Sequence, residues 1–301
     1  MAFCVKLEFV KKLADEMRKA ILPQFGKFAS KASEKNVAES GDTTFKLDTI
    51  AEDKLFEFLE TNNFQDAYYS EDRGLVKFSE NPKFVLVVDP IDGTRSAVCG
   101  LESSVISIAV ANCTQKPKFK DLILGVILEI KTGDIFWAEK GKGSFKNGIP
   151  LKSNSHSDLK KTFWAFETVG RPYLEIAKIL APLVKVTSIE AGVFLFSSSA
   201  FSLTRIATGQ FDAYLDISAR LLKENPILAE KFRDAGNGKI ITVFPYDIVA
   251  AKLILEEAGG IVTDAFGNSI EEEKLLTNPN LSLLVASNKE LHKKIYNLLE
   301  F

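Results

Sequence analysis

Apolar residues at intervals of three and four predict an amphipathic helix at the start of the chain. They are Leu7, Val10, Leu13, Met17 and Ile21. Pro23 ends this pattern, and the polar stretch 31–41 is expected to be an exposed loop because it has no apolar periodicity. A second helix is predicted over 49–59, with Asp48 or Thr49 as its cap.

An unbroken apolar run over 84–88 predicts a buried strand that ends in the polar turn 89–94. Three segments rich in β-branched residues follow, with Pro117 and several glycines between them. These segments span 105–111, 122–129 and 134–138. We expect them to form an antiparallel, meander-like sheet.

Near Pro150 the pattern changes to alternating strands and helices, which predicts an α/β second half. Strands are expected over 162–167, 184–189, 211–217, 243–245, 261–264 and 281–286, and helices over 173–183, 198–208, 226–235, 248–258 and 289–299. The segment 218–239 is a polar, charged insertion. The pattern thus predicts two parts, 1–150 and 151–301.

Composition excludes several classes of protein. The 301 residues carry a net charge of -2, which argues against binding a nucleic-acid polymer through a basic face. Every apolar run is far shorter than the roughly 20 residues of a membrane-spanning helix. Cys4, Cys99 and Cys113 have no metal-ligand spacing and form no even disulfide framework, so we expect no zinc site and a cytoplasmic location.

Two carboxylates three positions apart, Asp89 and Asp92, follow the strand 84–88. Mg²⁺ would explain their closeness, because it takes carboxylate and carbonyl oxygens as ligands. Pro90 stiffens the turn and leaves the Ile91 carbonyl able to face the same centre. The alternative is that Asp-Pro and Asp-Gly are ordinary turn pairs, and spacing alone does not decide between the two interpretations.

Three more acids lie at the ends of predicted elements. Glu71 follows the aromatic run 67–69, Asp48 precedes the second helix, and Asp247 precedes the helix 248–258. Such acids are usually solvated or capping, so none of them indicates a site alone.

Taken together, two segments resemble the signatures of the inositol monophosphatase superfamily, the magnesium-dependent, lithium-sensitive phosphatases. Residues 89–94 fit its Asp-Pro-Ile/Leu-Asp-Gly-Thr/Ser motif, and 247–260 fit its second motif, which ends in Glu-Ala-Gly-Gly. The turn 141–148 also matches, and the resemblance covers roughly 42–265. The chain departs from the family at Tyr246, where Trp is usual, and at Arg95-Ser96-Ala97.

The resemblance implies a layered αβαβα sandwich, of α+β or α/β class, that holds two or three Mg²⁺ ions. By correspondence, the first ion would bind Glu71, Asp89 and the Ile91 carbonyl, and the second would bind Asp89, Asp92 and Asp247. Thr94, with either Glu71 or Asp48, would orient and deprotonate a water.

On the substrate side, the resemblance implies that the N–H groups of Gly93 and Thr94 bind phosphate, while Ser198 and Asp216 lie near the rest of the substrate. A solvated strand end explains Asp216 equally well. The insertion 218–239 is expected to shape the substrate end or a subunit contact. Its Arg220 and Lys223, with Lys239, either reach a second phosphate or belong to a charged surface.

The implied function is hydrolysis of a small phosphorylated polyol or sugar, inositol monophosphate or fructose 1,6-bisphosphate, by a homodimer that contacts no membrane. One alternative is a 3′(2′),5′-bisphosphate nucleotidase. Another is a non-catalytic relative that binds metal or phosphosugar.

Overall fold

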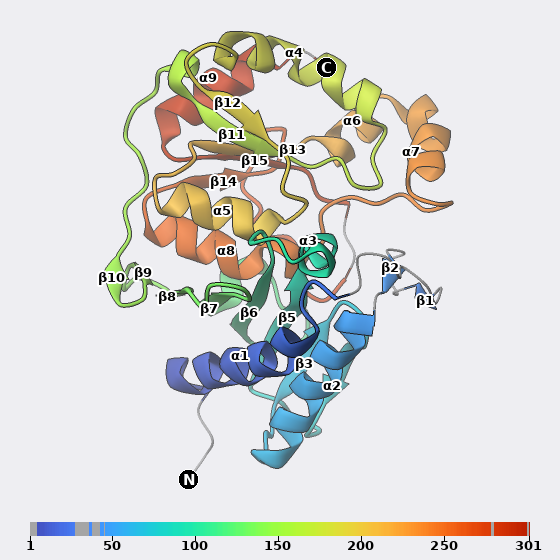
Figure 1. The fold of residues 1–301 in the computed structure, drawn as a ribbon, viewed down its shortest axis with the longest axis vertical. Helices are drawn as coiled ribbons and strands as arrows, with labels where there is room; N and C mark the ends of the chain where they lie inside the picture. The colour runs from blue at the N-terminus through green and yellow to red at the C-terminus, as the bar shows by residue number, and fades with distance from the viewer. Residues whose placement is uncertain (1–4, 28–35, 38–42, 45, 278–279, 300) are drawn as a thin grey trace.

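The computed structural model describes residues 5–27, 36–37, 43–44, 46–277, 280–299 and 301, and it forms five stacked layers (Figure 1). An eight-stranded sheet lies between two N-terminal helices and a middle helical layer. A five-stranded sheet covers the other side of that middle layer, and further helices cover its outer face. The predicted αβαβα sandwich is therefore confirmed. None of the described helices combines the length and apolar character needed to cross a bilayer.

The large sheet has the order β10-β9-β8-β7-β6-β5-β3-β4, in which only β3 and β5 pair in parallel. Its strands are β3 (Ala67–Ser70), β4 (Gly74–Lys77), β5 (Phe84–Asp92), β6 (Val105–Asn112), β7 (Leu122–Glu129), β8 (Ile135–Glu139), β9 (Ser144–Lys146) and β10 (Ile149–Pro150). The predicted meander is confirmed over β6, β7 and β8. The strand predicted over 84–88 continues to Asp92, with a register shift between Asp89 and Asp92.

Two amphipathic helices cover the outer face of this sheet, α1 (Leu7–Ile21) and α2 (Lys46–Thr61). Both were predicted, although α2 begins before Asp48, which lies in its first turn. The loop predicted over 31–41 falls almost entirely outside the described residues. Only Asn36–Val37 is described there, and it pairs as β1 with β2 (Thr43–Thr44).

The middle layer consists of α5 (Ser199–Ala207) and α8 (Pro245–Glu257), and α8 is packed directly on β7. A Cβ at Gly125 would lie 2.7 Å from the Ala250 carbonyl oxygen, so only glycine permits this approach. The Glu257 carboxylate accepts the N–H groups of Gly141 (2.6 Å) and Gly143 (2.8 Å). Two motifs far apart in sequence thus meet in one structural contact.

The small sheet has the order β12-β11-β13-β15-β14. Its strands are β11 (Phe163–Phe166), β12 (Gly192–Phe194), β13 (Ala213–Asp216), β14 (Ile261–Thr263) and β15 (Leu283–Ala286). β11 is parallel to β12 and β13, whereas β15 is antiparallel to its neighbours. Outside it lie α4 (Tyr173–Thr187) and α9 (Lys289–Leu298), whose buried residues form one core with the sheet.

One predicted strand, 184–189, is wrong. The helix α4 continues to Thr187, because Ile176, Leu180, Leu183 and Thr187 keep one buried face at helical spacing past Pro182. The strand predicted over 243–245 is reduced to one bridge between Val243 and Leu281, and α8 begins at Pro245.

The insertion 218–239 forms α6 (Ser218–Glu224), the short turn η4 (Pro226–Leu228) and α7 (Ala229–Ala235). Its Arg220 donates to the Ala265 carbonyl and lies 3.6 Å from the ring centroid of Phe301, while Lys223 lies over Phe266. These two cations therefore pack on aromatic side chains at the outer helical layer, and neither lines the pocket described below. Lys239 is exposed and does not line that pocket either.

The predicted division at residue 150 stays a prediction. The large sheet takes its strands from the first part and the small sheet from the second, but α8 contacts both β7 and β14.

Candidate active site

One pocket, with about 580 Å³ of empty space including its open mouth, lies where the two sheets and the middle helices meet. Its wall includes residues from β5, the β3–β4 turn, the start of α3 (Thr94–Cys99) and α8. Seven sequence-predicted residues line it: Glu71, Asp89, Ile91, Asp92, Gly93, Thr94 and Asp247. The fold thus brings together acids that are up to 176 positions apart, Glu71 and Asp247.

Asp89 bends the end of β5 toward the pocket. Its Oδ1 accepts the N–H of Ile91 at 3.0 Å, a local turn that coincides with the register shift of β5. The Thr94 hydroxyl oxygen in turn lies 2.9 Å from the Ile91 carbonyl oxygen. The chain can then reverse at Gly93, whose φ of 87° is left-handed and whose Cβ would lie 2.4 Å from the Ser103 carbonyl oxygen.

Asp92 is held by the first turn of α5. Its Oδ2 accepts the Ser198 hydroxyl at 2.7 Å and the Ala200 N–H at 2.6 Å. Ser198 is also the N-cap of α5, and its oxygen accepts the Phe201 N–H. Ser198 therefore lies behind a predicted metal ligand and does not itself line the pocket.

Asp247 lies in the first turn of α8, where its Oδ2 accepts the Phe244 N–H at 3.0 Å. Thr94 makes the corresponding link to α2, since its hydroxyl is 3.0 Å from Asp48 Oδ1. Asp48 stands behind Thr94 and outside the pocket wall. Asp48, one of the two acids proposed as partners for Thr94, therefore lies at hydrogen-bond distance from its hydroxyl.

The carboxylates raise one another's pKa. Burial raises the pKa of Asp89 well above its usual range, and Glu71, Asp92 and Asp247 raise it further. Burial also raises the pKa of Asp92 to about 7, although the Ser198 and Ala200 hydrogen bonds oppose this, and burial and then Asp92 raise that of Asp247. Several buried anions in one pocket are costly without a cation to neutralise them.

This donor set fits a hard divalent cation. Carboxylate oxygens and the Ile91 carbonyl are ligands that Mg²⁺ takes, and no cysteine or histidine is among the described residues that line the pocket. Over the described ranges, no three acidic, cysteine or histidine side chains already converge on one point at ligand distance. Like charges oppose such convergence until a cation neutralises them.

Asp216 does not line the pocket. It is 2% exposed, and its Oδ2 accepts Nη2 and Nε of Arg171 at 2.6 and 3.1 Å, while Oδ1 accepts the N–H of Ser218 at 2.9 Å. The carboxylate therefore acts as the counter-ion of a buried arginine.

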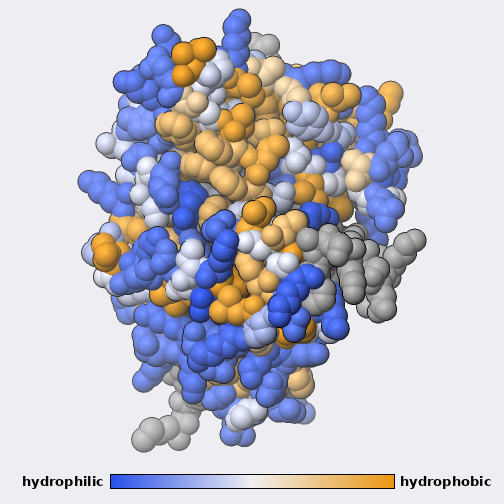
Figure 2. Space-filling view, in the orientation of Figure 1, coloured by the Kyte–Doolittle hydropathy of each residue, from blue (hydrophilic) through white to orange (hydrophobic). Residues whose placement is uncertain are grey.

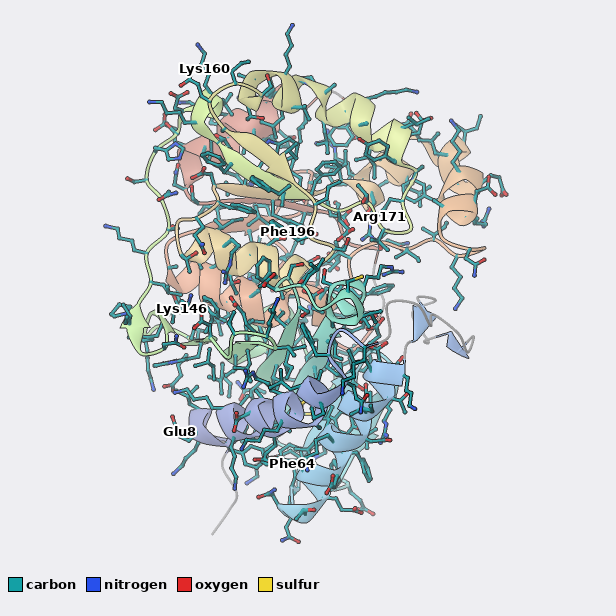
Figure 3. All side chains as sticks on the ribbon, viewed as in Figure 1. Glu8, Phe64, Lys146, Lys160, Arg171 and Phe196 are labelled. Atoms are coloured by element: carbon teal, nitrogen blue, oxygen red, sulfur yellow. The ribbon has the colours of Figure 1, made fainter. Side chains whose placement is uncertain are left out.

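Arg171 itself does line the pocket, together with Glu167, and the sequence reasoning missed both. They lie on the loop after β11, and Arg171 is seen between the level of the small sheet and that of α3 (Figure 3). Glu167 Oε1 accepts the N–H groups of Thr168 and Val169, so its orientation is fixed. The only sequence signal was an acid at the end of the strand predicted over 162–167 and an arginine four residues later, which is too common to indicate a site.

Comparisons with known proteins agree with this geometry. The model of the inositol monophosphatase family matches residues 6–301. A fructose-1,6-bisphosphatase/inositol-1-monophosphatase from Methanothermobacter thermautotrophicus is 30% identical, over 96% of this chain and 94% of its own. A bifunctional NADP phosphatase/NAD kinase from Methanocaldococcus jannaschii is 29% identical, over 95% of this chain but 49% of its own.

Solved structures share the fold. The extragenic suppressor protein suhB from Bartonella henselae has a TM-score of 0.74 at 19% identity, covering 98% of both chains. A Pyrococcus horikoshii protein described as similar to inositol-1 monophosphatase has a TM-score of 0.71 at 24% identity, with the same coverage. The chain therefore belongs to the inositol monophosphatase family and is a phosphoric monoester hydrolase.

Proposed function

We propose that this hydrolase is Mg²⁺-dependent and acts on a small phosphorylated polyol or sugar, inositol monophosphate or fructose 1,6-bisphosphate. The observation that carries the proposal is the single pocket that Glu71, Asp89, Asp92 and Asp247 share with the Ile91 carbonyl. Two or three bound Mg²⁺ ions would neutralise the phosphate oxygens and the leaving group and lower the pKa of the attacking water.

The chain's own groups orient and deprotonate that water. Thr94 Oγ1 is placed to accept a proton from the water while donating its own hydrogen to Asp48, because the two oxygens are 3.0 Å apart. The N–H groups of Gly93 and Thr94 would bind phosphate oxygens and stabilise the charge that develops on them.

The far wall of the pocket suits hydroxyl groups. Glu167 offers an acceptor and Arg171 a donor, both 8% exposed and both fixed by hydrogen bonds within their own loop. A polyol or sugar presents both donors and acceptors, so it matches this wall.

A phosphorylated nucleotide is the second candidate substrate, favoured by the relative named as an NADP phosphatase. The test is phosphate release from inositol 1-phosphate, fructose 1,6-bisphosphate, NADP and adenosine 3′,5′-bisphosphate, with Mg²⁺ or with EDTA. We expect turnover of the first two with Mg²⁺ only. Turnover of the nucleotides alone would overturn the substrate assignment, and no turnover of any ester would favour a non-catalytic binding protein.

A variant pair isolates the pocket carboxylates. Asp89→Asn should abolish activity, because it removes a ligand proposed for both ions. Asp66→Asn is the matched control. Asp66 is also buried, and its carboxylate accepts the N–H groups of Lys83 and Phe84 at the opposite end of β5. It should keep full activity where the protein folds.

We also propose that the protein is a homodimer, and its cytoplasmic location stays a prediction. An apolar surface supports the dimer: Val193, Phe194 and Leu195 are 36%, 39% and 53% exposed, and Leu101 is 52% exposed. Figure 2 shows apolar residues gathered in the upper and middle part of one face of the molecule. Leu195→Glu should convert the dimer to a monomer in sedimentation, because a charge in an apolar contact loses its hydration.

A further inference from the structure

The turn between β3 and β4 carries Glu71 into the pocket and Arg73 onto a helix. Ser70 pairs with Gly74, so residues 71–73 form the tip of a tight hairpin. Glu71 lines the pocket, whereas the Arg73 guanidinium contacts α2. The hairpin tip therefore connects the pocket to α2.

Arg73 makes three contacts within about one turn of α2. Its Nη2 donates to Asp53 Oδ1, its Nε lies 3.7 Å from Glu52 Oε2, and its guanidinium carbon lies 5.3 Å from the ring centroid of Phe56. A planar guanidinium can hold two carboxylates and one ring together, which a lysine cannot.

Glu52 is buried under the hairpin. Its side chain is 3% exposed, and Arg73 is its only ion-pair partner among the described residues. Besides Arg73, the Ser70 hydroxyl and the Asp72 N–H of the hairpin interact with this carboxylate and favour its charged form. A buried carboxylate depends strongly on its one cation, so Glu52 and Arg73 form a coupled pair.

The same helix also orients Thr94. Asp48 lies four residues before Glu52 on α2 and accepts the Thr94 hydroxyl at 3.0 Å. The apolar face of α2, which includes Ala51 and Leu55, is fully buried against the large sheet, so the helix is a rigid support. One element thus holds two separate parts of the pocket.

We propose that Glu52 and Arg73 are positioning residues that fix the hairpin tip, so that Glu71 keeps the place in which it binds a divalent cation. The inference rests on the proposed role of Glu71 as a metal ligand. Loss of an outer-shell partner of a metal ligand typically lowers metal affinity or activity by about 10- to 100-fold. Substrate binding at the far wall should be unchanged, because neither residue lines the pocket.

The test measures Mn²⁺ binding without substrate, by the electron paramagnetic resonance signal of free Mn²⁺, in Glu52→Gln, Arg73→Met and Arg73→Lys. We expect Glu52→Gln and Arg73→Met to raise the Mn²⁺ Kd by about tenfold, with a smaller effect for Arg73→Lys. The Mg²⁺ concentration for half-maximal activity should rise in parallel, while KM is unchanged and saturating Mg²⁺ restores kcat. The Mn²⁺ Kd of the double variant Glu52→Gln/Arg73→Met should be no higher than that of the weaker-binding single variant, because both substitutions act on the same hairpin.

Arg205→Met is the matched control. Arg205 also pairs with a buried acid, Glu129, and lies 4.5 Å from the Phe201 ring centroid, but it joins α5 to β7 away from the pocket. It should lower the urea midpoint without changing the Mn²⁺ Kd. An unchanged Kd in folded Glu52→Gln and Arg73→Met, or an equal loss in Arg205→Met, overturns the inference. Wild-type protein that binds Mn²⁺ but hydrolyses no ester would contradict the proposed function alone.

Discussion

At the scale of single residues, Thr94 offers the most direct test of the proposed deprotonation of water. Its hydroxyl contacts both Asp48 Oδ1 and the Ile91 carbonyl, which ties it to two elements. Thr94→Val keeps the size of the side chain but removes the hydroxyl that accepts the proton, so we expect kcat to fall by about 10²- to 10⁴-fold, as for loss of general-base assistance. Thr94→Ser should retain most of the activity. Equal losses in the two variants, measured by phosphate release, would show that the hydroxyl is not required.

Gly93 gives a prediction about stability. Alanine there would place its Cβ 2.4 Å from the Ser103 carbonyl oxygen, whereas at Gly141, which also has a left-handed φ, a Cβ meets nothing within 4 Å. Gly141→Ala should therefore cost only the strain of the backbone, about 1–2 kcal/mol. Gly93→Ala should cost clearly more. Urea unfolding of both variants separates backbone strain from steric clash. Similar losses in the free energy of unfolding would contradict the steric crowding at Gly93.

How far single residues were predictable depended on whether they stood in a motif. Asp89, Asp92 and Asp247 were found because their spacing matched two signatures, and the structure places all three in one pocket. Arg171 and Glu167 were missed, because nothing local distinguishes an arginine whose partner, Asp216, lies 45 positions away. Burial of such a pair follows only from the pairing of β11 with β13.

At the scale of elements, the start of α5 serves both stability and the site. Ser198 caps the helix and donates to Asp92. Ser198→Ala should cost about 1 kcal/mol of stability through the lost cap, and it should also weaken Mg²⁺ binding through Asp92. Ser188→Ala, at the exposed C-terminal end of α4, is the control. It also removes a serine hydroxyl, but Ser188 neither caps the start of a helix nor contacts a pocket acid. A lowered melting temperature with unchanged Mg²⁺ affinity would limit Ser198 to capping.

Elements with one strong pattern were predictable, and elements decided by packing were not. The helix α1 was predicted, because its apolar residues from Leu7 to Ile21 keep one buried face. The end of α4 was misassigned as a strand, because the sequence pattern of 184–189 does not show that the buried face of the helix continues to Thr187. Short strands such as β12 are fixed by pairing with a neighbour, which a single sequence does not display.

At the scale of the whole molecule, stability and metal binding are linked through the pocket acids. The pKa of Asp92 is raised from 3.8 to about 7, so its contribution to stability is present below about pH 4 and is lost as the pH rises through 7. The urea midpoint of the metal-free protein should therefore fall between pH 5 and pH 8. Mg²⁺ at pH 8 should restore it, because the ion binds only the folded chain.

The variant Asp92→Asn checks the cause of this pH dependence. It should flatten the decline in the urea midpoint of the metal-free protein and reduce the gain from Mg²⁺. Asp66→Asn, at the other end of the same strand, should leave the slope of the pH dependence unchanged. A wild-type midpoint that rises from pH 5 to pH 8 without metal would contradict a raised pKa at Asp92.

The packing of α8 against β5 has a consequence for biosynthesis. Asp92 emerges from the ribosome roughly 155 residues before Asp247, and α8 must then pack against the sheet that carries Asp92. Until that happens, the nascent chain holds an incomplete set of acids. The complete set of pocket acids therefore exists only after residue 247 of 301 has been made and α8 has packed on the sheet.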